Sequence, residues 1–233
     1  MAALTFESWS PQPNIMPEYT GELRIISTVD SYKSTTMSDT NQQMIALQGF
    51  LTAFYTDFKY AKAANFTGKI LYEDPAAYLR LPAARALNNV LTILKTRGLS
   101  IKVYDAYRPY SVTCLMWKVV PDTRYAADPA KGSAHNRGAA VDLTLVDINT
   151  GSELEMPTEF DDFTEKAHHS YQKLPLNVLN NRALLRAVME QAGFVALETE
   201  WWHYSLPQSS KRFVLMDLDF KQLKELQSET IEH

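Results

Sequence analysis

The chain has 233 residues, of which 45% are hydrophobic and 21% are charged, a composition typical of a globular protein with a sizeable core. The net charge is -4 and the basic residues are scattered along the chain, which argues against a nucleic-acid-binding surface of clustered Lys and Arg. A single cysteine, Cys114, excludes an internal disulfide framework and a cysteine-based zinc site.

Neither a membrane-spanning segment nor a secretory leader is indicated by the sequence. No stretch approaches the roughly 20 consecutive apolar residues of a membrane span. The first residues lack the basic and apolar regions of a secretory leader. We therefore expect a cytoplasmic protein, whereas a periplasmic location would require that a leader had been removed.

The N-terminal part of the chain shows little periodicity. Residues 1–38 are rich in Pro, Ser and Thr, which predicts an irregular N-terminal arm. From Ser38 onward, apolar side chains recur at three- and four-residue steps, which predicts a helix. These apolar residues are Met44, Leu47, Leu51 and Phe54. A clearer helix is predicted to begin at Pro82, because proline suits the first helical turn, and to end at Gly98.

Short strands and helices are mixed in the rest of the chain. Strands are predicted around residues 101–105, 141–145, 194–197 and 201–206. Helices are predicted over residues 109–119, over a segment that ends at Gly193, and after Phe220. Because regular βαβ alternation is missing, we expect an α+β fold, a single domain with a central antiparallel sheet flanked by helices. The domain would span residues 39–220, and a C-terminal helical tail would cover residues 221–233.

His135 and Asp142 are candidates for a metal site. Two imidazoles and one carboxylate form a recurrent ligand set for catalytic zinc, in which the fourth position is left for water. The loop between the two residues contains Gly138, which can adopt backbone angles that other residues resist, so it could fold His135 beside Asp142. His203 is the candidate for the third ligand. Alternatively, His135 could be a histidine of the core and Asp142 an aspartate that caps a turn, and neither would then need a metal.

Glu200 lies shortly before His203 in the sequence. A zinc hydrolase needs a carboxylate near the reacting water, to accept its proton and pass it to the departing amine. In an ideal strand, residues at this spacing face opposite sides, so Glu200 and His203 could share a site only at a bulge, bend or strand end. The spacing leaves Glu198 and Glu200 equally eligible as this proton-accepting carboxylate. Alternatively, Glu200 could be an exposed carboxylate of a strand without a catalytic role.

Arg108 follows the predicted strand that runs into Asp105. Pro109, directly after it, restricts the backbone, and the planar guanidinium group could point toward a carboxylate or an oxyanion. An arginine exposed at the surface would fit the same segment. The residue types in this segment therefore leave both a catalytic role and a surface position open for Arg108.

Several motifs occur together in one order along the chain. They are Tyr60-Ala61, Asn65-Phe66-Thr67-Gly68, Asp105-Ala106-Tyr107-Arg108-Pro109, Ser133-x-His135-x-x-Gly138-x-Ala140-x-Asp142, Phe160-Asp161, His168-His169 and Glu200-Trp201-Trp202-His203. In this combination, the sequence from about residue 57 to about residue 220 resembles the VanX-type D-alanyl-D-alanine dipeptidases of zinc peptidase family M15. The zinc motif alone is shared with carboxypeptidases and hedgehog-type domains, whereas the Asn-Phe-Thr-Gly and Glu-Trp-Trp-His segments point to the dipeptidases.

The resemblance implies a metal site and two catalytic residues. One zinc ion per chain would be held by His135, Asp142 and His203. Glu200 would be the catalytic base, and Arg108 would stabilise the tetrahedral intermediate. The implied fold is a small hedgehog/DD-peptidase-like α+β domain, with the site on an antiparallel sheet.

The resemblance also implies how the substrate is held. Asp161, together with Tyr60, would bind the ammonium group of the substrate, and Ser133 would bind its carboxylate. The family often carries Met-Gly ahead of this aspartate, whereas here the pair is Met156-Pro157, so we expect a different loop shape near Asp161. The pair His168-His169 falls at a family position, and we assign it a structural role.

These roles predict zinc-dependent hydrolysis of the dipeptide D-alanyl-D-alanine to two D-alanines, a reaction of peptidoglycan metabolism, without a covalent intermediate. The expected partner is this small dipeptide, with no nucleic acid and no membrane span. One alternative is a D,D-carboxypeptidase or endopeptidase that acts on longer peptidoglycan stems. Another is a non-catalytic, zinc-stabilised binding domain, and the presence of Glu200 and Arg108 argues against it because a structural metal site needs neither.

Overall fold

Two long neighbouring strands form the centre of the protein. The computed structural model describes residues 23–231. Within them, β5 (Leu99–Asp105) and β6 (Ala140–Asp147) pair antiparallel. Apolar side chains of both strands, among them Val103 and Leu143, are fully buried in the main hydrophobic core. The alternation of apolar and polar residues that predicted these two strands is therefore confirmed.

Three shorter strands extend this pair into a five-stranded sheet with the order β3-β5-β6-β8-β7. The added strands are β3 (Tyr55–Thr56), β7 (Val195–Ala196) and β8 (His203–Ser205). β8 pairs antiparallel with both β6 and β7, whereas β3 pairs parallel with β5 at the edge. The predicted central antiparallel sheet is thus confirmed, with one parallel pairing at its β3 edge.

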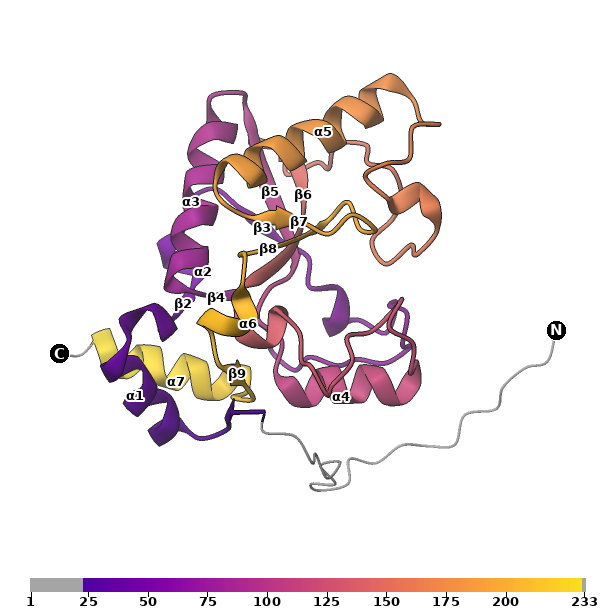
Figure 1. Cartoon of the computed structure of the whole chain (residues 1–233). Coiled ribbons are helices and arrows are strands. Elements are labelled where there is room, and N and C mark those ends of the chain that lie inside the picture. The colour runs from indigo at the N-terminus through magenta and orange to yellow at the C-terminus, as the bar shows by residue number, and fades with distance from the viewer. Residues whose placement is uncertain (1–22, 232–233) are drawn as a thin grey trace.

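Two long helices pack against the sheet and against each other. α3 (Leu81–Lys95) contacts β5, and α5 (Leu176–Gln191) contacts β6. Both helices lie beside the two central strands in the upper part of Figure 1. α3 has Pro82 in its first turn and buries an apolar face, and Gly98 just beyond it has a positive φ of 69°. The helix predicted between Pro82 and Gly98 is confirmed.

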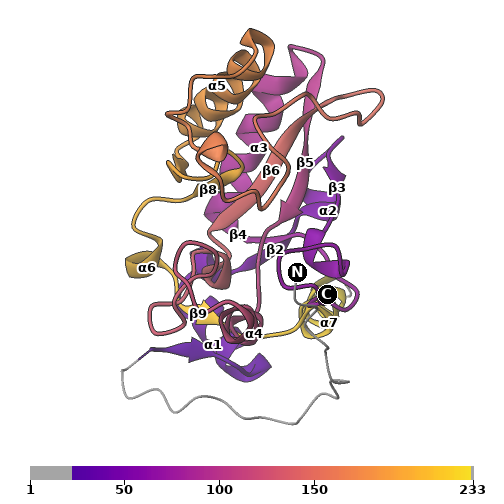
Figure 2. The ribbon, with the colours of Figure 1, turned by 90° about the vertical axis from the view of Figure 1, so that its right-hand side faces the viewer.

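The remaining elements are short strand pairs and helices that gather around the opposite end of the sheet. They are β1 (Ile25–Ile26), α1 (Val29–Ser38), β2 (Met44–Ala46), α2 (Leu47–Phe50), β4 (Tyr78–Arg80), α4 (Tyr110–Val119), α6 (Ser209–Arg212), β9 (Leu215–Met216) and α7 (Phe220–Ile231). β2 pairs antiparallel with β4, and β1 pairs parallel with β9. α1, α4 and α7 lie at the lower end in both views (Figure 1, Figure 2).

None of the described helices combines the length and the apolar character needed to cross a membrane.

The structure differs from the irregular arm that the sequence predicts for residues 1–38. Residues 1–22 lie outside the described residues, but the rest of this range contains β1 and α1. The Thr28 side chain accepts a hydrogen bond from the Ser31 backbone, and the Ser31 side chain accepts one from the Thr28 backbone. This capping box starts α1 although only Tyr32 and Thr35 of the helix are buried. Helix capping, which a search for apolar periodicity does not detect, explains the difference.

The helix predicted from Ser38 onward is wrong over most of its length. Met44 and its neighbours form β2, whose backbone pairs with β4. The helical turn α2 that follows contains Gly49 at a φ of 91°, which a regular α-helix does not permit. Leu47 and Leu51 are buried, but they reach the core from a turn and an extended segment. Burial of apolar residues at three- and four-residue steps therefore does not require a continuous helix here.

A buried arginine joins the β2–β4 pair to two other segments. Arg80 is 0% exposed. Its guanidinium group donates hydrogen bonds to the backbone carbonyls of Gln42, Arg137 (3.0 Å) and Val214 (3.0 Å). Burial lowers the pKa of Arg80 to about 10, so the side chain stays charged at neutral pH. One planar group thus connects the β2 segment, the loop before β6 and the chain leading into β9.

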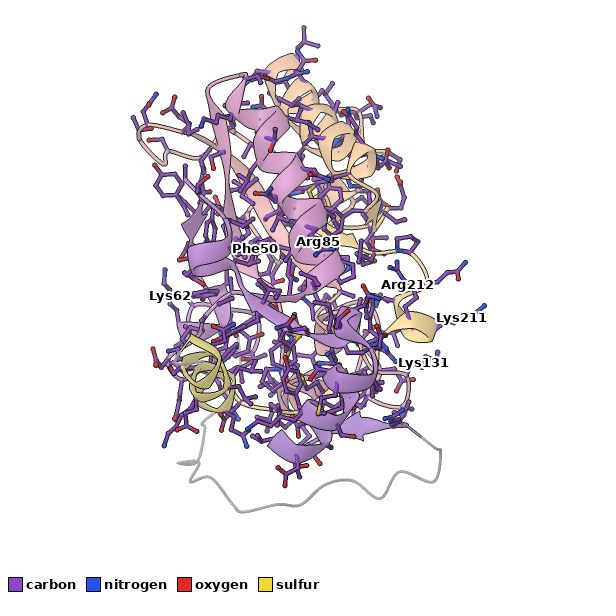
Figure 3. All side chains as sticks on the ribbon, turned by 90° about the vertical axis from the view of Figure 1, so that its left-hand side faces the viewer. Phe50, Lys62, Arg85, Lys131, Lys211 and Arg212 are labelled. Atoms are coloured by element: carbon purple, nitrogen blue, oxygen red, sulfur yellow. The ribbon has the colours of Figure 1, made fainter. Side chains whose placement is uncertain are left out.

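We predict that Arg80→Lys lowers the free energy of unfolding by about 2–4 kcal/mol, because an ammonium group cannot reach three carbonyls in fixed directions. Urea denaturation followed by circular dichroism would measure this change. The control is Arg85→Lys on α3, the helix that begins directly after Arg80, where the side chain is exposed (Figure 3). Equal stability of the two variants would contradict the connecting role of Arg80.

Candidate active site

A tight turn brings His135 beside Asp142. His135 lies in a 3₁₀ turn, η3 (His135–Arg137), that ends at Gly138 with a φ of 61°. The chain then enters β6, which carries Asp142. The backbone N–H of Gly138 donates to the carbonyl of His135 at 2.9 Å, and the Gly138 carbonyl accepts from the backbone of Arg80 at 2.7 Å. The left-handed glycine therefore reverses the chain as the sequence predicts.

The third predicted ligand comes from the neighbouring strand. The register of the sheet places His203 of β8 directly opposite Asp142 of β6. The Nδ1 atom of His203 lies 2.9 Å from Oδ1 of Asp142 and 3.1 Å from Nε2 of His135, and this Nε2 lies 3.4 Å from the same oxygen. Within the described residues, the structure thus brings the three predicted ligands together in one cluster.

The geometry and chemistry of this cluster fit zinc. Donor atoms bound to a tetrahedral zinc ion at 2.0–2.1 Å are about 3.3 Å apart, close to the separations found here. Nδ1 of His135 lies 2.6 Å from the carbonyl oxygen of Ala106. A proton on Nδ1 that donates to this carbonyl leaves the lone pair on Nε2 directed at the cluster. His135, Asp142 and His203 can therefore supply two imidazole nitrogens and one carboxylate oxygen.

A turn places Glu200 in the same cavity as His203. The Glu200 N–H donates to the Leu197 carbonyl at 3.1 Å, and the His203 N–H donates to the Glu200 carbonyl at 3.2 Å. The chain bends between these residues, and buried Trp201 and Trp202 hold the bend in the core. Glu200 therefore shares a site with His203 because it lies in a turn just before β8, which is one of the arrangements that the sequence leaves open.

The other eligible carboxylate, Glu198, lies elsewhere. Its Oε2 atom pairs with the guanidinium group of Arg186 on α5 at 3.3 Å, and its side chain is exposed. Glu200 lines the cavity beside the three candidate ligands, and burial raises the pKa of its carboxyl group. A raised pKa suits a group that both accepts and returns a proton near neutral pH. The position thus favours Glu200 over Glu198 as the base.

Arg108 is buried, which excludes the surface position that the sequence left open. Its Nε and Nη2 atoms donate to Oδ2 of Asp105 at 3.1 and 2.7 Å. Its guanidinium carbon lies 5.1 Å from the centre of the Tyr60 ring. Burial opposes the charge, but Asp105 and other acidic neighbours, among them Tyr72, together outweigh it and raise the pKa of Arg108 well above its usual value. The result is a fixed positive charge in the wall of the cavity.

Asp161 and Tyr60 meet on another wall of the cavity. Asp161 has a positive φ of 60°, and its Oδ1 atom accepts a hydrogen bond from the Tyr60 hydroxyl at 3.3 Å. Its Oδ2 atom is buried and has no hydrogen-bond partner among the described residues. Burial, together with the charge of Asp142, raises the pKa of Asp161 well above its usual range. A cation bound at Oδ2 would relieve this cost.

Ser133 also lines the cavity, next to the turn that carries His135. Its Oγ atom accepts a hydrogen bond from the backbone N–H of His135 at 3.1 Å, and its own N–H donates to Oδ1 of Asn136 at 2.8 Å. The hydroxyl proton of Ser133 can therefore point to a bound anion without breaking these two contacts. This position is compatible with the carboxylate-binding role that the resemblance implies.

The cavity formed by these side chains has a volume of about 250 Å³, below the range of roughly 300–1,000 Å³ for sites that enclose drug-sized ligands. It therefore suits a small substrate. Several further lining residues were not singled out from the sequence, because no motif or spacing marks them. They are Thr123, Arg124, Tyr125, Ala126, Ala127, Phe163 and Leu197.

His169 lies outside the cluster of candidate ligands. Its ring contacts Tyr204 edge to face at a centroid distance of 6.1 Å, and its backbone N–H donates to the Glu198 carbonyl at 2.9 Å. Burial lowers the pKa of His169 to about 4, so the ring is neutral at physiological pH. These contacts fit the structural role expected for this part of the His168-His169 pair.

We predict that Gly138→Ala impairs both folding and metal binding. A Cβ atom at this position would lie 2.8 Å from Sδ of Met44 and 3.3 Å from the backbone nitrogen of Arg80, in addition to the left-handed strain of about 1–2 kcal/mol. Gly98→Ala is the matched control, since Gly98 also has a positive φ but its Cβ would meet nothing within 4 Å. Isothermal titration with zinc should show at least about tenfold weaker binding for Gly138→Ala only. Equal zinc affinity in both variants would argue against this role of the turn.

Comparison with known proteins identifies the family. Residues 40–223 match Peptidase_M15, described as D-ala-D-ala dipeptidase. The chain is 38% identical to a D-alanyl-D-alanine dipeptidase of Escherichia coli (strain K12) over 181 residues, which cover 78% of this chain and 93% of that relative. It is 34% identical to a D-alanyl-D-alanine dipeptidase of Enterococcus faecium, covering 64% of this chain and 84% of the relative. Among solved structures, the LdcB LD-carboxypeptidase matches with a TM-score of 0.39 and 19% identity, over 68% of this chain and 69% of LdcB. The family match and the identities to the two dipeptidases show that the chain belongs to the M15 peptidases described as D-alanyl-D-alanine dipeptidases.

Proposed function

We propose that this protein hydrolyses D-alanyl-D-alanine to two molecules of D-alanine with one zinc ion per chain, held by His135, Asp142 and His203. The observation that carries the proposal is Asp161, whose buried Oδ2 atom lacks a partner within the described part of the chain and shares a small cavity with the three candidate ligands. A dipeptide supplies the missing cation as its free ammonium group, next to the bond that is cleaved. The names of the two dipeptidase relatives support the same substrate.

The proposed chemistry requires an activated water and a residue that transfers its proton. When bound, zinc supplies Lewis acidity, which polarises a peptide carbonyl group and lowers the pKa of a water molecule to about 7. Glu200 accepts a proton from the attacking water and passes it to the nitrogen of the departing D-alanine. Its place in the cavity beside His203 and its raised pKa support this assignment.

The tetrahedral intermediate carries negative charge on the former carbonyl oxygen. Arg108 provides a positive charge in the wall of the cavity, and Asp105 fixes the direction of its planar group through two hydrogen bonds. A donor that is oriented before the reaction stabilises developing charge without reorganisation. Stabilisation of this oxygen is therefore the role that we assign to Arg108.

The two ends of the dipeptide are assigned to different walls of the cavity. Asp161, supported by the Tyr60 hydroxyl, binds the ammonium group, and Ser133 binds the carboxylate. In a longer peptidoglycan stem, the same nitrogen is acylated and carries no charge, so Asp161 would stay buried without a cation. This cost favours the dipeptidase over a carboxypeptidase or endopeptidase that acts on longer stems.

We predict that kcat/KM for D-alanyl-D-alanine exceeds that for N-acetyl-D-alanyl-D-alanine by at least about 100-fold, because an unpartnered buried carboxylate costs several kcal/mol. Release of D-alanine, measured with a coupled oxidase, would give both rates. Asp161→Asn should slow cleavage of the free dipeptide and reduce the difference in kcat/KM between the two substrates. Comparable rates of the unaltered enzyme on both substrates would refute the proposal in favour of a carboxypeptidase.

We predict that Glu200→Gln keeps its zinc but loses about 10²–10⁴-fold in kcat, because the amide cannot accept a proton from water. Glu198→Gln is the matched control, since Glu198 pairs with Arg186 and does not line the cavity. Steady-state kinetics and elemental analysis would be run on both variants. Loss of zinc from Glu200→Gln would make Glu200 a ligand, and a larger loss of activity in Glu198→Gln would reverse the assignment.

A further inference from the structure

A buried tyrosine outside the cavity contacts the residue that holds Arg108. Tyr72 is 3% exposed and does not line the cavity. Its hydroxyl group donates a hydrogen bond to Oδ1 of Asp105 at 2.8 Å. The ring packs edge to face against Phe220 of α7 at a centroid distance of 5.1 Å and against Tyr60 at 5.8 Å. Aromatic packing on two sides therefore fixes the direction of the Tyr72 hydroxyl.

Asp105 divides its two oxygens between different partners. Oδ1 accepts the Tyr72 hydroxyl and the backbone N–H of Ala106 (2.9 Å), while Oδ2 accepts both donors from Arg108. The carboxylate is 1% exposed, so water does not replace a lost contact easily. Its orientation depends on the bonds at Oδ1, and this orientation sets where Oδ2 holds the guanidinium group.

The same short segment also contacts the metal site. The backbone N–H of Ala106 donates to Asp105. The carbonyl oxygen of the same residue lies 2.6 Å from Nδ1 of His135. A β-bulge between Val103 and Asp105 brings Asp105 opposite Asp142 on β6. Asp105 therefore lies between the arginine of the cavity and the backbone that orients His135.

From these contacts we propose that Tyr72 is a positioning residue, which acts through Asp105 to hold the guanidinium group of Arg108 in the orientation that stabilises the reaction intermediate. This inference rests on the proposed function. Burial and the charge of Asp105 raise the pKa of Tyr72 well above its ordinary value, so the hydroxyl stays protonated and acts as a donor. Tyr72 does not line the cavity, and its ring packs on Tyr60, whereas its hydroxyl contacts Asp105. The effect of the hydroxyl therefore reaches the reaction through Asp105.

The test is Tyr72→Phe, which removes the hydroxyl and keeps the packed ring. We expect kcat on D-alanyl-D-alanine to fall about 10–100-fold, while KM changes less than about twofold and zinc content is unchanged. In an Arg108→Ala background, Tyr72→Phe should cause no further loss, because its effect passes through Arg108. An unchanged kcat, or a full additional loss in the double variant, would overturn the inference.

Tyr107→Phe is the matched control. Tyr107 is 1% exposed and packs on the same Phe220 at 6.2 Å, but its hydroxyl donates to the carbonyl of Leu218 at 2.8 Å. Both variants lose one buried hydroxyl, and we expect both to lower thermal stability. Only Tyr72→Phe should lower kcat, and an equal fall in kcat for Tyr107→Phe would reduce the role of Tyr72 to general stability.

A second measurement separates this inference from the proposed function. In ¹⁵N-arginine-labelled protein, exchange of the Arg108 Nε–H with solvent can be followed by nuclear magnetic resonance, with Arg108→Lys to assign the signal. We expect exchange at least about tenfold faster in Tyr72→Phe than in the unaltered protein or Tyr107→Phe. Unchanged exchange would overturn the positioning role even if the dipeptide is hydrolysed. Inactivity of the unaltered enzyme on the dipeptide would overturn the proposed function, while the exchange rates would still decide whether Tyr72 positions Arg108.

Discussion

The hydrogen-bond register of β6 with its two neighbours is the constraint on which the site depends. Asp142 lies opposite His203 on β8, and the bulge in β5 places Asp105 opposite Asp142 from the other side. A shift of one residue in either pairing would turn the side chains to the opposite face of the sheet. The candidate metal ligands therefore rely on the packing of the apolar face, where α3 and α5 cover the strands.

The sequence was most informative where one local signal determines the structure. Pro82 and Gly98 marked both ends of α3, and Gly138 marked the turn that returns the chain to β6. The motif around His135 and Asp142 also predicted residues that lie together in the structure. Apolar spacing was less reliable after Ser38, since the same burial is reached by a strand and a turn.

Contacts between distant parts of the chain were beyond the reach of periodicity. Spacing left Glu198 and Glu200 equally eligible, and only the turn before β8 and the pairing of Glu198 with Arg186 separate them. The contact between Tyr72 and Asp105 depends on how the segment before β4 packs against β5 and α7, which no motif encodes. Such contacts carry the orientation of catalytic groups, so the sequence indicated the participants better than their arrangement.

The cavity lining combines three carboxylates with one buried arginine, and this balance supports the proposal that a metal cation and a cationic substrate end bind there. The most direct test is to remove bound metal with a chelator and then to titrate zinc into the protein while release of D-alanine from D-alanyl-D-alanine is followed. The account predicts no activity in the metal-free protein, and a linear rise that ends at about one equivalent of zinc per chain. Activity without metal, or a rise that continues to two equivalents, would contradict it.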